Sequence, residues 1–384
     1  MFDQIRSLAQ WHDVELVTWK ESADRISRKT QLSDPFQGKV KVVSWGEDET
    51  SREGIGKRTL RTLNSLFSAA PSPADFYYPR SLDHRQELSE VDLAIYHYTY
   101  AWNWLSSRDN VREKTRVLHF HNIESDLYRL RAENEKIGPF RVIHRMNARK
   151  LTDIERILPN LVDECWYVSA KDASDFQTRL GHPAACQRVR PPSYDPARLL
   201  QRQRRFVEDL DQSRRMGSVL GFVGTLDFAP NILSLEWILD RLGPELLRRG
   251  WSGTLRVVGR NPSPEMREKL KQYPFVEYLG FLTDMEDFWS SLSAFLIPHI
   301  EGSGVRVKLL DAVASGIPTL ANSAAVERVD KALIGSSLLW VSDDPQDWVR
   351  RILSIDGHQE RKLLAMKPLE QVLDGNFIYG DFRE

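Results

Sequence analysis

The segment PHIEGSGVRVKLLDAVASGIP (298–318) contains the residue types and spacing best suited to chemistry. A Gly-Ser-Gly turn at 302–304 precedes a helical pattern that carries Arg306 and Lys308 near its start. Glycines let the backbone approach a ligand closely, and a helix N-terminus offers unpaired N–H groups and a positive potential. Two added positive charges suit a diphosphate. The segment therefore predicts an anion site.

Asp311 adds a carboxylate to this segment, three residues after Lys308 and on a neighbouring face of the same helix. A carboxylate in that place can accept hydrogen bonds from ribose hydroxyls. The alternative interpretation is a plain strand–turn–helix unit with charged surface residues. Spacing alone leaves both interpretations open.

Apolar runs alternate with helical patterns on both sides of this segment, and they supply the elements that must position it. In the C-terminal half, the predicted strands are 218–224, 254–259, 276–281, 294–298, 318–322 and 338–341, and the predicted helices are 231–250, 263–273, 285–292 and 305–315. In the N-terminal half, the predicted strands are 14–19, 39–45, 92–98, 115–121 and 165–169, and a long helix is predicted from Phe140 to Leu158. This alternation predicts an α/β fold with parallel sheets, whose ligands bind at the carboxyl ends of the strands.

Length and composition restrict the class of protein. A chain of 384 residues exceeds one typical core, so two domains are expected. The 53 basic and 54 acidic residues cancel, which argues against nucleic acid as a partner. Cys165 and Cys186 have no metal-type spacing, and two buried free thiols in a reducing cytosol fit them better than one disulfide. With neither a signal-peptide pattern nor a long apolar run, the sequence predicts a cytoplasmic protein without a membrane span.

The predicted domain boundaries follow the shifts in composition. An N-terminal domain is expected over 1–192, and a linker over 193–214 that begins in a proline-rich stretch and continues into a charged one. A C-terminal domain is expected over 215–350, followed by a tail over 351–384 that packs back towards the N-terminal domain.

Several further motifs occur in a fixed order along the chain. In the C-terminal half these are GFVGTLDFAPN (221–231), LRVVGRNP (255–262), GFLTD (280–284) and GSGVRVKLLDAVASGIP (302–318). In the N-terminal half they are HNIES (121–125) and ARKLTDIERILPNLVDECWYVSAKD (148–172). Together they resemble the retaining GT-B glycosyltransferases, the large family 4-like group 1. The resemblance spans most of the chain and implies two Rossmann-like domains that face each other across a cleft.

The resemblance implies a metal-independent hexosyltransferase without a cofactor. Such an enzyme moves a sugar from a nucleotide-diphosphate sugar to a glycan or lipid-linked acceptor with retention, in polysaccharide or glycoconjugate biosynthesis. The implied catalytic residues are His121 beside the transferred sugar, and Arg306 and Lys308 at the leaving phosphate. The implied donor-binding residues are Gly224, Thr225, Arg260, Phe281, Glu301, Ser303, Gly304, Val305 and Asp311.

The chain departs from the family pattern in three places. Many members have glutamate where Ser303 stands, and Glu301 lies two residues earlier; Asp311 replaces the commoner glutamate. The family also opens with a strand and a glycine-rich loop, whereas IRSLAQWHDVELVTW (5–19) resembles the end of the following helix and the next strand. Either the true start lies upstream or the N-terminal sheet lacks its first strand. The open alternatives are therefore a catalytically degenerate scaffold or regulator, and a nucleotide-sugar epimerase.

Histidines and one basic stretch complete the candidates. His119 and His121 alternate along a predicted strand and point to one face, and we expect His119 to be a satisfied core residue. His84, His97 and His144 show no metal-ligand spacing, so no metal site is expected. The basic stretch Arg141–Lys150 fits either peripheral contact with a membrane surface or a solvated helix face.

Overall fold

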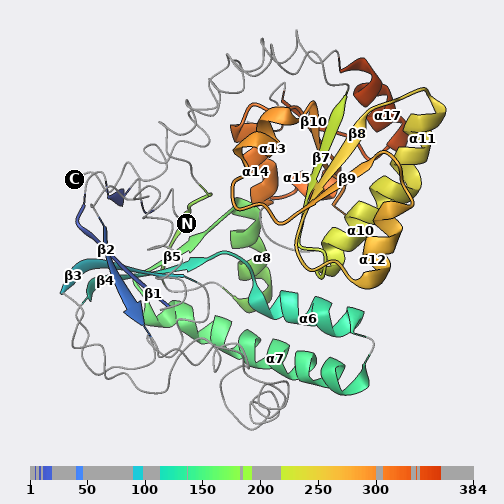
Figure 1. Cartoon of the computed structure of the whole chain (residues 1–384). Coiled ribbons are helices and arrows are strands. Elements are labelled where there is room, and N and C mark those ends of the chain that lie inside the picture. Colours follow the sequence, from blue (N-terminus) through green and yellow to red (C-terminus); the bar gives the residue numbers. More distant parts are fainter. Residues whose placement is uncertain are drawn as a thin grey trace. The chain divides into compact units, whose positions relative to one another are not determined.

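The computed structural model describes residues 5, 8–9, 12–19, 40–45, 90–97, 113–135, 137–181, 185–192, 218–299, 306–329, 334 and 338–355. The chain forms two compact units, the first within residues 1–191 and the second within residues 192–378 (Figure 1). The linker predicted over 193–214 and most of the tail predicted over 351–384 lie outside the described residues.

The second unit is built on a parallel sheet of six strands in the order β12-β11-β10-β7-β8-β9. The strands are β7 (Val219–Val223), β8 (Thr254–Val258), β9 (Val276–Gly280), β10 (Ala294–Ile297), β11 (Thr319–Ala321) and β12 (Leu339–Val341). Strands β7, β8 and β9 follow one another towards one edge of the sheet, and β10, β11 and β12 follow one another towards the other edge. The order therefore reverses between β7 and β10, as in the Rossmann fold, and a crevice opens at such a reversal. The predicted α/β fold is confirmed.

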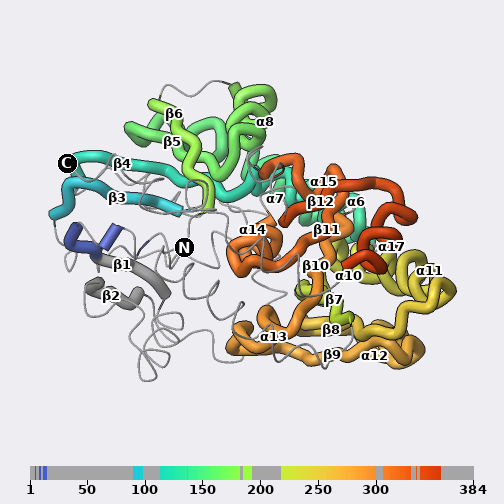
Figure 2. Tube along the Cα trace, turned by 90° about the horizontal axis from the view of Figure 1, so that it is seen from above, coloured from blue at the N-terminus to red at the C-terminus, as the bar shows by residue number. Residues whose placement is uncertain are grey.

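Helices cover both faces of this sheet. They are α10 (Ala229–Trp237), the π turn η5 (Ile238–Leu242), α11 (Gly243–Arg248), α12 (Pro264–Lys271), α13 (Glu286–Ser291), α14 (Val307–Ala314), α15 (Ser323–Val326) and α17 (Pro345–Ser354). Figure 2 shows the strands in a row with α13 and α14 on one side and α10, α11 and α17 on the other. Strand β10 shows why two cores form, because Phe295 and Ile297 pack on the α13–α14 side while Ala294 and Leu296 pack on the α10 side.

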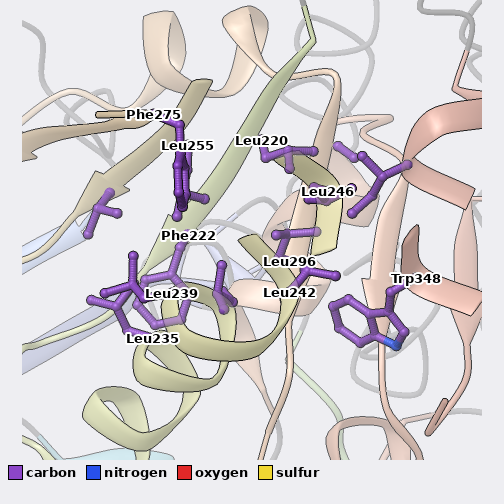
Figure 3. Packing of buried hydrophobic residues seen from close by; sticks show 14 of the residues in the cluster. Leu220, Phe222, Leu235, Leu239, Leu242, Leu246, Leu255, Phe275, Leu296 and Trp348 are labelled. Atoms are coloured by element: carbon purple, nitrogen blue, oxygen red, sulfur yellow. The ribbon is translucent and has the colours of Figure 1, made fainter. Parts of the chain in front are cut away.

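The core on the α10 side is filled mainly by leucines and aromatic rings (Figure 3). Leu235, Leu239 and Leu242 reach it from the segment predicted as one helix over 231–250. The structure instead places a π turn in that segment, where the Gly243 N–H donates to the Ile238 carbonyl. Pro244 follows and has no N–H to donate, which disfavours regular helical hydrogen bonding at this point. Helix α17 also packs into this core and crosses the boundary predicted at residue 350.

The first unit contains a parallel sheet of four strands in the order β3-β4-β5-β6 and a separate parallel pair, β1-β2. The strands are β1 (Val14–Trp19), β2 (Val40–Trp45), β3 (Val91–His97), β4 (Glu113–Phe120), β5 (Glu164–Tyr167) and β6 (Cys186–Val189). Its helices are α6 (Glu124–Asn134), α7 (Gly138–Ile157), the 3₁₀ turn η3 (Leu158–Leu161) and α8 (Ala170–Leu180). None of the helices described in the chain is long and apolar enough to cross a membrane.

The two faces of β4 have different environments. Leu118 and Phe120 point into a core that also takes side chains from α7 and α8. His119 lies between them in sequence and points to the other face, because side chains alternate along a strand. Both cysteines of the sheet are free, but Cys186 is exposed, so the prediction that both thiols are buried is wrong for this residue.

Candidate functional site

A pocket of about 710 Å³ lies in the second unit at the carboxyl ends of its strands. It occupies the place where the strand order reverses, which is where ligands bind in open parallel sheets. Seven predicted site residues line it: Gly224, Thr225, Arg260, Phe281, Arg306, Lys308 and Asp311. The predicted residues Glu301, Ser303, Gly304 and Val305 lie outside the described residues. His121 belongs to the first unit.

The loops after β7 and β8 form one wall of the pocket and hold each other by backbone contacts. The Gly224 N–H donates to the Val258 carbonyl at 3.0 Å, and the Leu226 N–H donates to the Arg260 carbonyl at 2.8 Å. A Cβ added to Gly259 would lie 2.1 Å from the Gly224 carbonyl oxygen, and one added to Gly224 would lie 2.7 Å from Asn231 Cγ. Both positions therefore require glycine, and the wall presents bare backbone to the pocket.

Lys308 crosses from the first turn of α14 to the end of β7. Its Nζ donates to the Val223 carbonyl at 3.0 Å and to Asn231 Oδ1 at 2.9 Å, and it lies 5.1 Å from the centre of the Phe222 ring. An ammonium group has three N–H donors, so one remains for a ligand. The lysine charge is thus held in one place by groups from two neighbouring elements.

Burial, together with the nearby charge of Arg306, lowers the pKa of Lys308 from 10.5 to about 8. The protonated form still dominates at pH 7, but it is held in an environment that disfavours positive charge. An anion in the pocket would relieve both the desolvation and the repulsion between the two cations. The electrostatics of the pocket therefore favour a negatively charged ligand.

Arg306 lies at the N-cap position of α14, and its Nη2 contacts Nε2 of His299. His299 is itself fixed by Asn322, whose Oδ1 accepts the His299 N–H at 3.0 Å and whose Nδ2 donates to the His299 carbonyl at 2.6 Å. The backbone N–H groups of a helix N-terminus carry partial positive charge. Arg306, Lys308 and the start of α14 thus form the positive part of the pocket lining, next to the end of β7 that leads into Gly224 and Thr225.

The remaining predicted residues lie around this centre. Asp311 also lines the pocket, one turn after Lys308 on α14. Arg260 is exposed, and the Phe281 side chain is 65% exposed at the end of β9. A flat ring and a guanidinium at the rim suit the base of a nucleotide, because both groups stack on planar rings.

Sequence reasoning missed two residues of this pocket. Asn231 positions the Lys308 ammonium, and His299 contacts Arg306. Asn231 lies inside the quoted motif 221–231, yet its partner Lys308 is 77 residues away, so no local pattern reveals the contact. His299 directly follows the strand predicted over 294–298, and it is buried, with only 7% of its surface exposed.

His121 lies directly after β4, beside two other histidines. Its Nε2 lies 2.8 Å from Nδ1 of His97, at the end of the neighbouring strand β3. His119 is buried as expected, and although its ring nitrogens make no well-aligned hydrogen bond within the described residues, the backbone of Arg190 interacts with the ring. Burial lowers the pKa of His97 to about 4 and that of His121 to about 3. These imidazoles are therefore neutral at pH 7.

Comparisons with known proteins agree with this architecture. Residues 217–355 match the family model described as Glycosyl transferases group 1, whereas no curated protein sequence matches the chain significantly. Anabaena HepE in complex with UDP and glucose has a similar structure, with a TM-score of 0.55, 15% identity, and coverage of 98% of this chain and 92% of that chain.

Two trehalose-6-phosphate synthases are also similar in structure. The enzyme from Burkholderia multivorans gives a TM-score of 0.58 at 11% identity, covering 96% of this chain and 97% of that chain. Another, studied for glycosyl transfer with retention, gives a TM-score of 0.58 at 12% identity, covering 97% and 98%. The fold is thus that of the GT-B glycosyltransferases. Residues 217–355 carry the similarity to the glycosyl transferases group 1.

Proposed function

We propose that the pocket of the second unit binds the nucleotide diphosphate of a sugar donor, and that the chain transfers the sugar to an acceptor. The observation that carries this proposal is the fixed pair of cations, Arg306 and Lys308, at the N-terminus of α14 beside the glycine-lined end of β7. The diphosphate would contact the cations and the backbone of Gly224 and Thr225. The ribose would lie at Asp311.

In the proposed reaction, the bond between the anomeric carbon and the diphosphate oxygen breaks, the acceptor oxygen forms the new bond to that carbon, and the proton of the acceptor hydroxyl passes to the leaving diphosphate. Negative charge develops on the leaving diphosphate as the bond breaks. Arg306, Lys308 and the helix N-terminus stabilise that charge without reorganisation, because Asn231 and His299 already hold the two side chains in place. This is the basis for proposing metal-independent hexosyl transfer.

Retention of the anomeric configuration and the acceptor are proposed by resemblance to the family. One structurally similar trehalose-6-phosphate synthase is described with a retaining mechanism, and HepE was solved with UDP and glucose. We propose a glycan or lipid-linked acceptor, bound by the first unit, in polysaccharide or glycoconjugate assembly. His121 would then lie beside the transferred sugar and donate or accept a hydrogen bond as a neutral imidazole.

For location we propose the cytoplasm, with peripheral contact to an anionic membrane through α7. Two free thiols fit a reducing compartment. Helix α7 and the residue before it expose the apolar side chains of Ile137, Phe140 and Val142 beside exposed Arg145 and Arg149. Sedimentation with phosphatidylserine vesicles, but not with neutral ones, supports the membrane contact, and no sedimentation with either refutes it.

The donor proposal is tested by thermal shift of the full chain with UDP-, GDP-, ADP- and dTDP-sugars. A donor at one hundred times its dissociation constant stabilises the fold by about 2.7 kcal/mol. We expect a shift with one nucleotide family, retained in Lys271→Ala on the exposed surface of α12 and lost in Lys308→Ala. Folded protein that responds to none of the four donors contradicts the proposal and favours the degenerate scaffold.

A further inference from the structure

Three histidines from distant positions in the sequence meet on one face of the first unit's sheet. Strands β3 and β4 are parallel, and their register pairs His97 directly with His119. His121 lies two residues further along and points to the same side. The three ring centroids are 4.5 to 5.3 Å apart, and each ring offers a nitrogen that lies within 4.8 Å of the other two.

His119 is the member of this cluster that packing alone does not explain. Only 2% of the residue is exposed, and within the described residues neither ring nitrogen makes a well-aligned hydrogen bond, although the Arg190 backbone interacts with the ring. The indole of Trp166 meets its ring edge-on, but the indole N–H donates to Glu164 at 2.8 Å instead. Buried polar atoms without well-aligned partners cost up to about 1–3 kcal/mol each, so a ligand that engages the His119 ring would remove part of that cost.

The chemistry of the cluster narrows the class of ligand. The three imidazoles lie close enough to share one ion, and among the described residues no carboxylate belongs to the group. Mg²⁺ and Ca²⁺ prefer oxygen ligands, whereas imidazole suits zinc, copper and nickel. Three protein nitrogens with an open fourth position are a known coordination set of Zn²⁺.

We propose that His97, His119 and His121 bind one divalent transition-metal cation of the zinc class. With Zn–N bonds of about 2.0–2.1 Å, tetrahedral ligand atoms lie about 3.3 Å apart. The 2.8 Å separation of His97 and His121 is already shorter than that, so the rings must rotate modestly to admit the ion. The parallel register of β3 and β4 fixes the backbone positions of His97 and His119.

This proposal differs from the expectation of no metal site, which rested on sequence spacing alone. His97 is separated from His119 by 22 residues, and only the strand pairing brings the two together. The proposal does not depend on the donor pocket, which lies in the other unit. His121 alone is shared between the two proposals, so the test relies on His97 and His119.

The experiment is calorimetric titration of the full chain with Zn²⁺ after removal of metal with EDTA. We expect one Zn²⁺ per chain, no competition from excess Mg²⁺, and loss of binding in His119→Phe and His97→Phe. The loss should exceed the roughly 10–100-fold that removal of an outer-shell partner costs. The control is His12→Phe, which removes an exposed histidine outside the cluster and should bind as the wild type does.

A second measurement separates loss of ligands from loss of fold. His119→Phe removes two buried nitrogens that make no well-aligned hydrogen bond in the described part of the chain, so in EDTA it should unfold at the same urea concentration as the wild type or a higher one. The visible absorption bands of bound Co²⁺ should appear in the wild type and vanish in His97→Phe. Folded wild type that binds no stoichiometric Zn²⁺, or equal Zn²⁺ affinity in the wild type and both variants, overturns the proposal.

Discussion

The lowered pKa of Lys308 makes the pH dependence of nucleotide binding a sharp test of the donor pocket. The lysine must be protonated to attract a diphosphate, and its pKa of about 8 lies far below the ordinary 10.5 because of burial and the neighbouring Arg306. Raising the pH from 7 to 9 therefore removes a charge that an ordinary lysine would keep. The perturbation needs no mutation, and the substitution Lys308→Met serves as its control.

The expected size follows from the protonated fraction. With a pKa of about 8, the ratio of charged to neutral Lys308 is about ten to one at pH 7 and about one to ten at pH 9. If only the charged form binds, the apparent affinity scales with that fraction and falls about tenfold over this range. Lys308→Met should bind weakly at pH 7 and show no such fall.

The assay is calorimetric titration at pH 7, 8 and 9 with the nucleoside diphosphate selected by the thermal-shift panel. Titration of the ligand itself would affect Lys308→Met and the wild type alike, so the difference between them isolates the lysine. Lys271→Met removes an exposed lysine on α12 and should follow the wild type. Equal pH profiles in the wild type and Lys308→Met would refute the assignment of Lys308 to the diphosphate.

Three further predictions follow from the packing. Gly259→Ala should lower the free energy of unfolding in urea by about 1–3 kcal/mol, because the new Cβ would meet the Gly224 carbonyl. The control Gly138→Ala should cost little, because its Cβ meets nothing within 4 Å, and equal costs for the two variants would contradict this prediction. Burial raises the pKa of Glu155 to about 7 from 4.5, so the folded state favours the protonated carboxyl. As the pH rises from 4.5 to 7, the wild type should therefore lose up to about 3 kcal/mol of unfolding free energy relative to Glu155→Gln, and parallel stability profiles of the two proteins would refute this prediction. Asn322→Ala removes the N-cap of α15 and the hydrogen bonds that hold the His299 backbone. It should lower the free energy of unfolding by about 1 kcal/mol and raise the KM for the donor. An unchanged KM would show that these hydrogen bonds do not serve the pocket.

The sequence predicted the pocket well because its parts are local. Each strand end, the turn at Gly224 and the start of α14 carry their own signals within a few residues. Parallel topology then brings them to one edge of the sheet without further information. Seven of the predicted site residues consequently line one pocket.

The sequence did not predict contacts that depend on packing between distant elements. The bond from Lys308 to Asn231 spans 77 residues, and the meeting of His97 with His119 depends on strand register. The π turn at Ile238–Leu242 likewise depends on Gly243 and Pro244 inside an otherwise regular helical pattern. Strand β6 was missed because only four residues form it, with little apolar character.

The central claim is tested most directly by following release of nucleoside diphosphate from the sugar donor that the thermal-shift panel selects. The wild type should release it, and Arg306→Ala should do so about 10²–10³-fold more slowly while remaining folded. Arg248→Ala on the exposed surface of α11 provides the matched control and should behave as the wild type. Interconversion of the donor sugar without release would instead identify an epimerase. Equal rates in the wild type and Arg306→Ala would contradict the account.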